Sequence, residues 1–252
     1  MERPGLLQRV GARLFGHAPT PDDPFAVFTA PNALTINRAR QSHLGSLGLD
    51  LGGKNVLEVG AGIGLHTPFF LERGCRVTVT DGRRENVAEV ARRLPGVKTA
   101  IVDLERDEPL DGRLGRFDVV YCYGLLYHLA NPERALARLA EVCTGLLLLE
   151  TAVSPGNHDE LLLVRDPDAF NQAVSGIGCR PTRLWVLNRL KSLLGHGYIP
   201  RSQPDHVDFP DDWQQPPIQL MYRSIFVGSR QTLALPTLAA DVPALQDKHR
   251  GG

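Results

Sequence analysis

The segment VLEVGAGIG, residues 56–64, constrains the fold more than any other part of the chain. Its first half has the pattern of a buried β-strand, its second half carries glycines at three alternate positions, and a helical pattern follows from Leu65 to about Arg73. Glycine is needed where the backbone turns with a positive φ angle or where a ligand touches the main chain. Because the first N–H groups of a helix are unpaired, this strand–turn–helix unit predicts a nucleotide-binding element.

Acidic residues follow the turn at the ends of two further predicted strands. Strand 76–81 ends in Asp81, whose carboxylate can accept two hydrogen bonds from a ribose diol. The next strand, predicted at 98–104, ends in Asp103 and Leu104, an acid and an apolar side chain placed to contact an adenine amine and ring. The order of these residues therefore predicts an adenosine site along one edge of a sheet.

The spacing and the acids together resemble the class I S-adenosylmethionine-dependent methyltransferases. The glycines follow the pattern G-x-G-x-G, with an acid two residues before the first, instead of the G-x-G-x-x-G pattern of NAD-type sites, which is the competing use of this geometry. The resemblance covers residues 54–151 closely and 181–229 loosely. It implies S-adenosyl-L-methionine as the cofactor. The cofactor-binding residues that it implies are Glu58, Gly60, Ala61, Gly62, Gly64, Asp81, Asp103, Leu104 and Tyr123.

The pattern of elements predicts an α/β fold with a Rossmann-like, doubly wound sheet. The resemblance implies seven strands, mostly parallel, with an antiparallel last strand. The predicted strands are 55–60, 76–81, 98–104, 117–123, 146–150, 198–199 and 218–227. The predicted helices are 65–73, 84–94, 132–143, with Pro132 in its first turn, and 181–194, together with an N-terminal helix that Asn32 caps and that runs to about Leu47.

We expect three regions. Residues 1–50 form an N-terminal helical extension that includes an amphipathic piece at 6–15, residues 51–230 form the methyltransferase domain, and residues 231–252 form a flexible tail. Within the domain, the stretch at about 152–180 after the fifth strand is too long for an ordinary loop and is expected to fold over the site as a cap, and 201–216 is a loop before the last strand.

Composition narrows the function classes. The chain has 252 residues, with 28 basic and 28 acidic residues, so no global positive field attracts nucleic acid. It has no apolar run long enough to cross a bilayer and no secretory signal pattern. The four cysteines contain no C-x-x-C pair, which favours reduced thiols in a cytoplasmic protein. The loop residues 158–160 (HDE) lack the spacing of a known metal site, so no metal is predicted.

His128 is the best candidate for a general base. It lies in the segment after the fourth strand, at the edge where doubly wound sheets bind ligands, and its imidazole titrates near neutral pH. The alternative is a structural role for His128. Tyr127 is then the second candidate, although it more naturally forms an aromatic wall, and His206 with Asp208 lies in the loop before the last strand. His66 is expected to line the pocket or begin a helix.

The acceptor class stays open at this stage. A small metabolite, such as a sugar or another natural product, is the leading class for O- or N-methylation. The turn GLLYH at 124–128 resembles that of enzymes that alkylate the wobble uridine of tRNA, and a local basic run could bind a phosphodiester backbone or form the solvated face of one helix. Its members are Arg180, Arg183, Arg189, Lys191 and Arg201.

A third hypothesis is a noncatalytic subunit that keeps the fold, but the intact glycines and acids weigh against it. The sequence does not reveal the oligomeric state.

Overall fold

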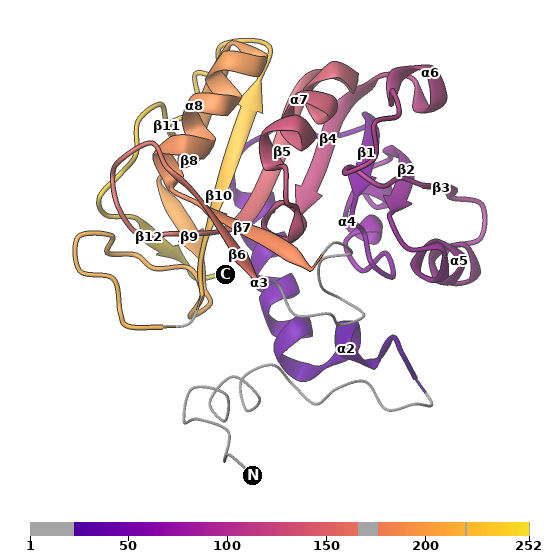
Figure 1. The fold of residues 1–252 in the computed structure, drawn as a ribbon, viewed down its shortest axis with the longest axis horizontal. Helices are drawn as coiled ribbons and strands as arrows, with labels where there is room; N and C mark the ends of the chain where they lie inside the picture. The colour runs from indigo at the N-terminus through magenta and orange to yellow at the C-terminus, as the bar shows by residue number, and fades with distance from the viewer. Residues whose placement is uncertain (1–22, 166–175, 220, 252) are drawn as a thin grey trace.

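The computed structural model describes residues 23–165, 176–219 and 221–251 (Figure 1). The predicted amphipathic piece at 6–15 lies outside these residues. The helices are α2 (Ala26–Thr29), α3 (Pro31–Ser46), α4 (Thr67–Leu71), α5 (Arg84–Arg93), α6 (Asp111–Leu114), α7 (Pro132–Val142) and α8 (Arg183–Leu194), with a short 3₁₀ turn, η1 (Leu126–His128). The strands of the main sheet are β1 (Asn55–Val59), β2 (Arg76–Asp81), β3 (Lys98–Ile101), β4 (Phe117–Tyr123), β5 (Cys143–Val153), β8 (His196–Pro200), β10 (Tyr222–Ser229) and β11 (Leu238–Ala239).

The main sheet has the order β11-β8-β10-β5-β4-β1-β2-β3. Strands β3, β2, β1, β4 and β5 pair in parallel, and β10 runs antiparallel to both β5 and β8. The predicted fold class is therefore confirmed, including the antiparallel last strand of the seven. The two-residue strand β11 adds an eighth strand at the edge, which the sequence did not predict.

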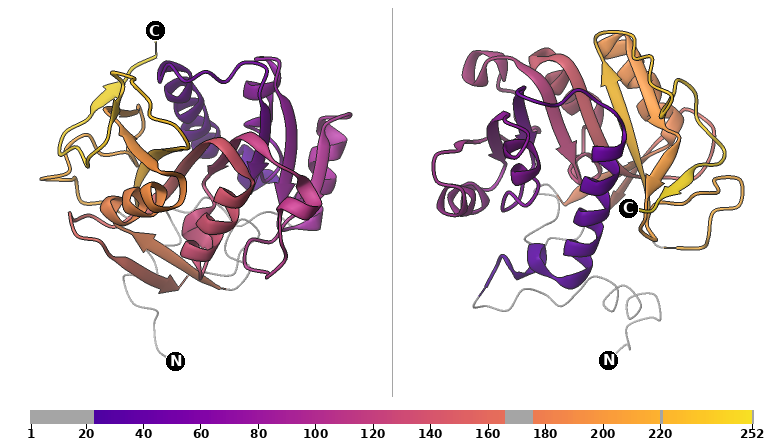
Figure 2. Two further views of the ribbon diagram at one scale, coloured as in Figure 1. Left: turned by 90° about the horizontal axis from the view of Figure 1, so that it is seen from above. Right: turned by 180° about the vertical axis from the view of Figure 1, so that it is seen from behind.

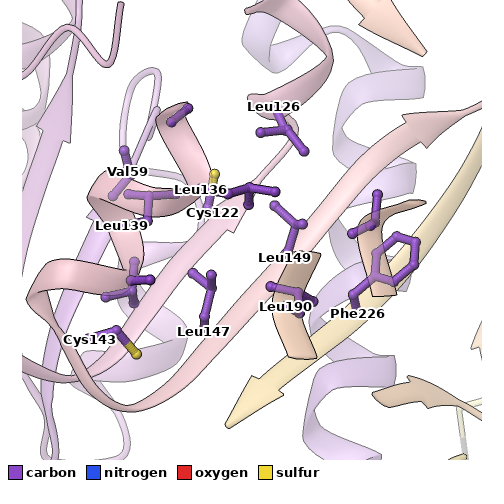
Figure 3. Packing of buried hydrophobic residues seen from close by; sticks show 14 of the residues in the cluster. Val59, Cys122, Leu126, Leu136, Leu139, Cys143, Leu147, Leu149, Leu190 and Phe226 are labelled. Carbon is purple, nitrogen blue, oxygen red and sulfur yellow. The ribbon is translucent and has the colours of Figure 1, made fainter. Parts of the chain in front are cut away.

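Helices cover both faces of this sheet (Figures 1 and 2). Strand β5 contributes alternate residues to two separate cores: Leu147 and Leu149 pack with the core beneath α7 and α8, and Leu148 packs with the core beneath α3, α4 and α5. Figure 3 shows the first core, where Leu136 and Leu139 of α7 meet side chains of β4 and β5. Burial on both faces explains the continuous run of apolar residues that identified this strand.

Helix boundaries follow local chemistry. Pro132 begins α7 as predicted, and the Asn131 side chain before it accepts a hydrogen bond from the Arg134 N–H. The prediction that Asn32 caps the N-terminal helix is wrong, because α3 already begins at Pro31, whose fixed φ suits the first helical position. The predicted helix 65–73 is also shorter, since α4 covers only Thr67–Leu71.

The segment after Arg230 is not a loose tail. Strand β11 pairs with β8, and β12 (Asp247–His249) pairs in parallel with β9 (Ser202–Pro204). Between them, the Gln246 side chain is 5% exposed; it accepts a hydrogen bond from the Trp213 indole and donates one to the Pro200 carbonyl. The expectation of a flexible tail is therefore wrong, because these contacts fix the segment beside the sheet edge.

The stretch after β5 contains a small antiparallel hairpin, β6 (Leu161–Arg165) and β7 (Ile177–Pro181). It packs on the η1 turn, where the Cys179 thiol donates to the Leu126 carbonyl and the Arg180 guanidinium donates to the Tyr127 carbonyl. The hairpin thus lies beside the segment that follows β4.

No helix among the described residues has the length and apolar character that crossing a membrane requires.

Candidate active site

The glycine turn after β1 has the positive φ angles that its sequence predicts. Gly60, Gly62 and Gly64 have φ angles of 66°, 55° and 75°, in the left-handed region that side chains disfavour. The Gly62 N–H donates to the Asp81 carboxylate at 2.9 Å, which ties the turn to the end of β2. A Cβ atom at Gly62 would lie 2.7 Å from the ring of Phe28, so only glycine fits beneath that residue of α2.

Asp81 is the centre of a hydrogen-bonded group. Its Oδ1 accepts from the Arg83 N–H and from the Asn86 amide at 3.0 Å, and its Oδ2 accepts from Gly62. Burial raises the pKa of the Asp81 carboxyl, and the hydrogen bonds from Arg83, Gly62 and Asn86 partly offset the rise. Asn86 was not predicted as a site residue. Its Oδ1 is buried and has no hydrogen-bond partner among the described residues.

The structure brings Asp103 to the same edge as Asp81. Ile101 pairs with Asp81, and the Val102 N–H donates to the Asp81 carbonyl, so Asp103 begins the loop just beyond β2. The Asp103 side chain is 26% exposed. Leu104, in contrast, is buried in the core beneath α7 and already has apolar neighbours. Its predicted contact with an adenine ring stays a prediction.

Glu58 lies beneath the glycine turn and is 2% exposed. Burial raises the pKa of its carboxyl to about 7. The Thr67 hydroxyl donates to this carboxyl at 2.7 Å, and that hydrogen bond partly offsets the rise in pKa. This carboxyl therefore titrates near neutral pH and can change its charge in response to a nearby cation.

A polar aromatic group lines the end of β4. Desolvation lowers the pKa of His66 to about 3, so the ring is neutral, and its Nδ1 shares a hydrogen bond with the Tyr121 hydroxyl at 2.6 Å. Tyr123 stacks on Tyr121 with ring centroids 4.3 Å apart. The Tyr123 Oη is buried and has no partner among the residues that the structure describes. The role of Tyr123 in binding the cofactor stays a prediction.

A buried ion cluster closes the other side of this edge. The Glu150 carboxylate is 0% exposed and receives Arg40 from α3 at 2.7 Å and Arg223 from β10 at 3.0 Å. Burial alone would raise the pKa of Glu150, but the two guanidinium groups hold it below its usual value. A Cβ atom at Gly124 would lie 3.8 Å from Arg40, which places this cluster next to the segment after β4.

The base candidates differ in their surroundings. His128 is buried, and its ring centroid lies 3.9 Å from that of Tyr127. The Tyr127 hydroxyl accepts a hydrogen bond from Arg223 at 3.1 Å, so it belongs to the ion cluster. His206 accepts a hydrogen bond at Nδ1 from the Asp208 N–H, which leaves its proton on Nε2 and makes it a hydrogen-bond donor instead of a base.

The predicted basic run does not form a continuous free face in the part of the chain that the structure describes. The Arg183 guanidinium is buried and lies 3.8 Å from the centre of the Trp213 ring. Arg189 pairs with Glu133 at 2.9 Å, and Lys191 donates to a backbone carbonyl. With Arg180, which donates to the Tyr127 carbonyl, four of the five basic side chains are thus held by intramolecular contacts.

Among the described residues, no three or more His, Cys, Asp or Glu side chains are grouped so that they could hold a metal ion. All four cysteines are buried as free thiols.

Comparison with known proteins identifies the family. The profile of the methyltransferase domain matches residues 7–188, which is more than half of the chain. The chain belongs to this methyltransferase family. The predicted family is thereby confirmed.

Two kinds of curated relatives share part of the sequence. A ubiquinone biosynthesis O-methyltransferase of Xanthomonas oryzae pv. oryzae is 36% identical over 148 residues, covering 56% of each protein. A tRNA U34 carboxymethyltransferase of Syntrophotalea carbinolica is 40% identical over 76 residues, covering 29% of this chain and 22% of the relative. The chain therefore spans about half the length of the first relative and much less of the second.

Solved methyltransferase structures share the fold at low sequence identity. The N-terminal domain of EvdMO1, solved with S-adenosylhomocysteine, has a TM-score of 0.59 at 21% identity, with 83% of this chain and 82% of that one covered. Magnesium protoporphyrin IX methyltransferase from Synechocystis PCC 6803, solved with S-adenosylmethionine, has a TM-score of 0.51 at 15% identity, with 90% and 92% covered.

The sequence interpretation missed the three residues that form the ion pairs of this cluster, Arg40, Glu150 and Arg223. Arg40 lies in the extension whose role was left unassigned, and Arg223 lies inside a strand. Glu150 carried a signal, because it is the only charged residue in the run LLLLE and a buried strand rarely ends in an unpaired acid.

We predict that Glu58 makes stability fall with rising pH. Its folded-state pKa of about 7 lies above the ordinary 4.5, so the folded protein keeps a proton that the unfolded chain releases. This contribution is complete below pH 4.5 and is lost as the pH rises through about 7. Denaturant unfolding of wild type and Glu58→Gln across this range should show the wild type losing stability relative to the variant, by about 1.4 kcal/mol for each pKa unit. A difference that stays constant with pH would contradict the raised pKa.

Proposed function

We propose that this protein is an S-adenosylmethionine-dependent methyltransferase that acts on a small-molecule acceptor. The observation that carries the proposal is the joint geometry of the glycine turn and Asp81, with Gly62 at a positive φ and its N–H on the Asp81 carboxylate. When bound, the cofactor supplies a methyl group activated by the positive sulfonium. The protein's contribution is to bind and align the reactants, which can supply a large share of the rate.

The residues at this edge fit the two ends of that cofactor. Asp81 and Asn86 offer acceptor atoms for a ribose diol, and the carboxylate of Asp103 suits an exocyclic amine. At the other end, Tyr123 Oη and Arg40 Nε are buried polar atoms without partners among the described residues. A buried donor without a partner is costly, and the carboxylate of an amino-acid moiety would satisfy both atoms.

Glu58, beneath the glycine turn, suits the amino group of the same amino-acid moiety. Its carboxyl titrates near neutral pH, and a cationic amino group nearby would favour its charged form. In this proposal, Glu58 pairs with the amino group of the cofactor, and Tyr123 and Arg40 pair with its carboxylate. This is the charge pattern that a zwitterionic amino acid requires.

A small acceptor is favoured over tRNA on two grounds. The ubiquinone relative of Xanthomonas oryzae, whose name specifies O-methylation in the synthesis of a small molecule, aligns with 56% of this chain, and the tRNA U34 carboxymethyltransferases of Syntrophotalea carbinolica and Pseudomonas putida align with 29% and 47%. The basic run that could have bound a phosphodiester backbone is largely occupied by contacts with Trp213, Glu133 and the backbone. Similarity to two tRNA U34 carboxymethyltransferases is the specific observation that keeps tRNA as the second candidate acceptor.

We assign to His128 the role of accepting the proton from a hydroxyl acceptor. It lies on η1 directly after β4, beside Tyr127, on the edge that also carries the unpartnered Tyr123 Oη. His206 is less suited, because its Nδ1 is already an acceptor and its pKa is lowered by burial despite Asp208.

Binding of S-adenosylhomocysteine tests the cofactor assignment through a pair of glycines. Gly62 and Gly53 have φ angles of 55° and 67°, so an alanine at either position costs about 1–2 kcal/mol of backbone strain. Nothing lies within 4 Å of a Cβ atom at Gly53, whereas a Cβ atom at Gly62, in the turn, would meet Phe28 of α2. By calorimetric titration, Gly62→Ala should weaken S-adenosylhomocysteine binding by at least about tenfold beyond Gly53→Ala. Equal affinities, or tighter binding of NAD than of S-adenosylhomocysteine by wild type, would overturn the assignment.

Labelled methyl transfer tests the acceptor class. Wild type is incubated with S-adenosylmethionine carrying a tritiated methyl, in one reaction with pooled phenols and sugars and in another with bulk tRNA. We expect the label in the small-molecule extract. Label in acid-precipitable tRNA, with transfer that falls steeply as salt rises, would replace the small-molecule proposal with the RNA one.

The base assignment is tested with the acceptor that this assay identifies. His128→Ala should lower turnover by about 10²-fold or more while the S-adenosylhomocysteine dissociation constant stays nearly constant. His196 is the matched control: it lies at the amino end of β8, paired with Ser229 at the opposite edge of the sheet, and His196→Ala should keep wild-type turnover. If His128→Ala also keeps it, His128 is structural.

A further inference from the structure

An arginine outside the predicted site organises the loop that carries Asp103. Arg138 lies on α7, is 6% exposed, and directs its guanidinium into the loop between β3 and α6. Its Nη1 donates to the carbonyls of Asp103 and Leu104, the latter at 2.8 Å, and to that of Arg106. Its Nη2 donates to the carbonyl of Glu108. One side chain thus gathers four carbonyls of a single loop.

Other contacts also hold this loop: the Glu105 carbonyl accepts a hydrogen bond from Arg134 of α7, and the Glu105 carboxylate accepts one from the Ala130 N–H. The Arg106 N–H donates to the Asp103 carbonyl, and the Glu105 N–H donates to the Asp103 carboxylate at 2.9 Å. Because a guanidinium is planar and donates in fixed directions, Arg138 sets the relative positions of the carbonyls that it binds. The backbone of Asp103 is therefore held from α7 and not by the sheet alone.

The position that Arg138 fixes is next to Asp81. A Cβ atom at Gly82 would lie 4.0 Å from the Asp103 Cα, and the Val102 N–H donates to the Asp81 carbonyl. The Asp103 side chain is partly exposed at this edge, with Arg106 at 3.4 Å from one of its oxygens. A carboxylate accepts hydrogen bonds and does not donate them, so it binds an amino group and disfavours a carbonyl oxygen.

We propose that Arg138 is a positioning residue that fixes Asp103 for selection of an aminopurine over a ketopurine nucleoside. This inference rests on the proposed function, because it concerns the base-recognising end of the same site. Arg138 does not itself contact the ligand. It acts by holding the Asp103 backbone, so that the carboxylate meets the exocyclic amine of adenine.

The experiment compares two ligands that differ at one position. S-Adenosylhomocysteine carries an amino group on its purine, and S-inosylhomocysteine carries a carbonyl oxygen there. Wild type should bind the first at least about tenfold more tightly, since a site that pairs with a substrate N–H rejects an analogue without it. Arg138→Met should reduce this ratio by about tenfold, mainly by weakening S-adenosylhomocysteine binding, as measured by calorimetric titration.

Arg230 provides a matched control. Its guanidinium also gathers three backbone carbonyls, those of Cys143, Leu193 and Ala140, but it lies at the opposite edge of the sheet. Arg230→Met should lower the melting temperature and leave the ligand ratio at the wild-type value. Arg138→Lys keeps the charge but has fewer aligned donors, and it replaces Arg138→Met in the experiment if that variant does not fold. The ligand ratio of Arg138→Lys should lie between those of wild type and Asp103→Asn.

A double-mutant cycle on Asp103 and Arg138 separates positioning of Asp103 from a general contribution of Arg138 to stability. In the Asp103→Asn background, Arg138→Lys should cause no further change in the ligand ratio. An unchanged ratio in the Arg138 variants, an equal drop in Arg230→Met, or a wild type that does not discriminate would each overturn the inference while the cofactor assignment stands. A wild type that binds neither ligand would refute the proposed function, and the inference with it.

Discussion

The site depends most on the pairing of the buried Glu150 carboxylate with two arginines. The carboxylate is completely buried and is neutralised by Arg40 from the N-terminal helix and Arg223 from the antiparallel strand. Removing one member of such a group leaves an uncompensated buried charge, which typically costs about 3–5 kcal/mol. The cluster therefore ties α3 and β10 to the end of β5, and it brings an arginine of the N-terminal extension to the carboxyl edge of the sheet.

This arrangement gives the edge two chemically different halves. Toward β2 and β3, acids and an amide with free acceptor atoms surround the glycine turn, as a nucleoside requires. Toward β4 and β5, unpartnered donors of Tyr123 and Arg40 lie beside the ion cluster. The proposed methyltransferase would bind its cofactor across both halves, with η1 and the β6–β7 hairpin beside the second.

Much of this could be predicted from the sequence because the signals are local. The buried strand, the glycine spacing and the acids at strand ends each follow from neighbouring residues, and the structure brings Gly62, Asp81 and Asp103 to one edge. The missed features depend on distant pairs. Arg40 and Glu150 are 110 positions apart, and Arg138 binds carbonyls about 30 positions before it, so neither pairing leaves a pattern in the sequence. The tail was misjudged for the same reason, since Gln246 is held by Trp213 and Pro200.

The most direct test of this account is a double-mutant cycle on Arg40 and Glu150, measured as free energies of unfolding in urea. Arg40→Met and Glu150→Gln should each destabilise the protein, and the double variant should lose less than their sum. We expect a coupling energy of about 1–3 kcal/mol, as contacting residues in one buried network show. Effects that add to within about 0.5 kcal/mol would mean that the two side chains are energetically independent. That result would contradict the claim that the Glu150 carboxylate fastens the N-terminal helix to the active-site edge.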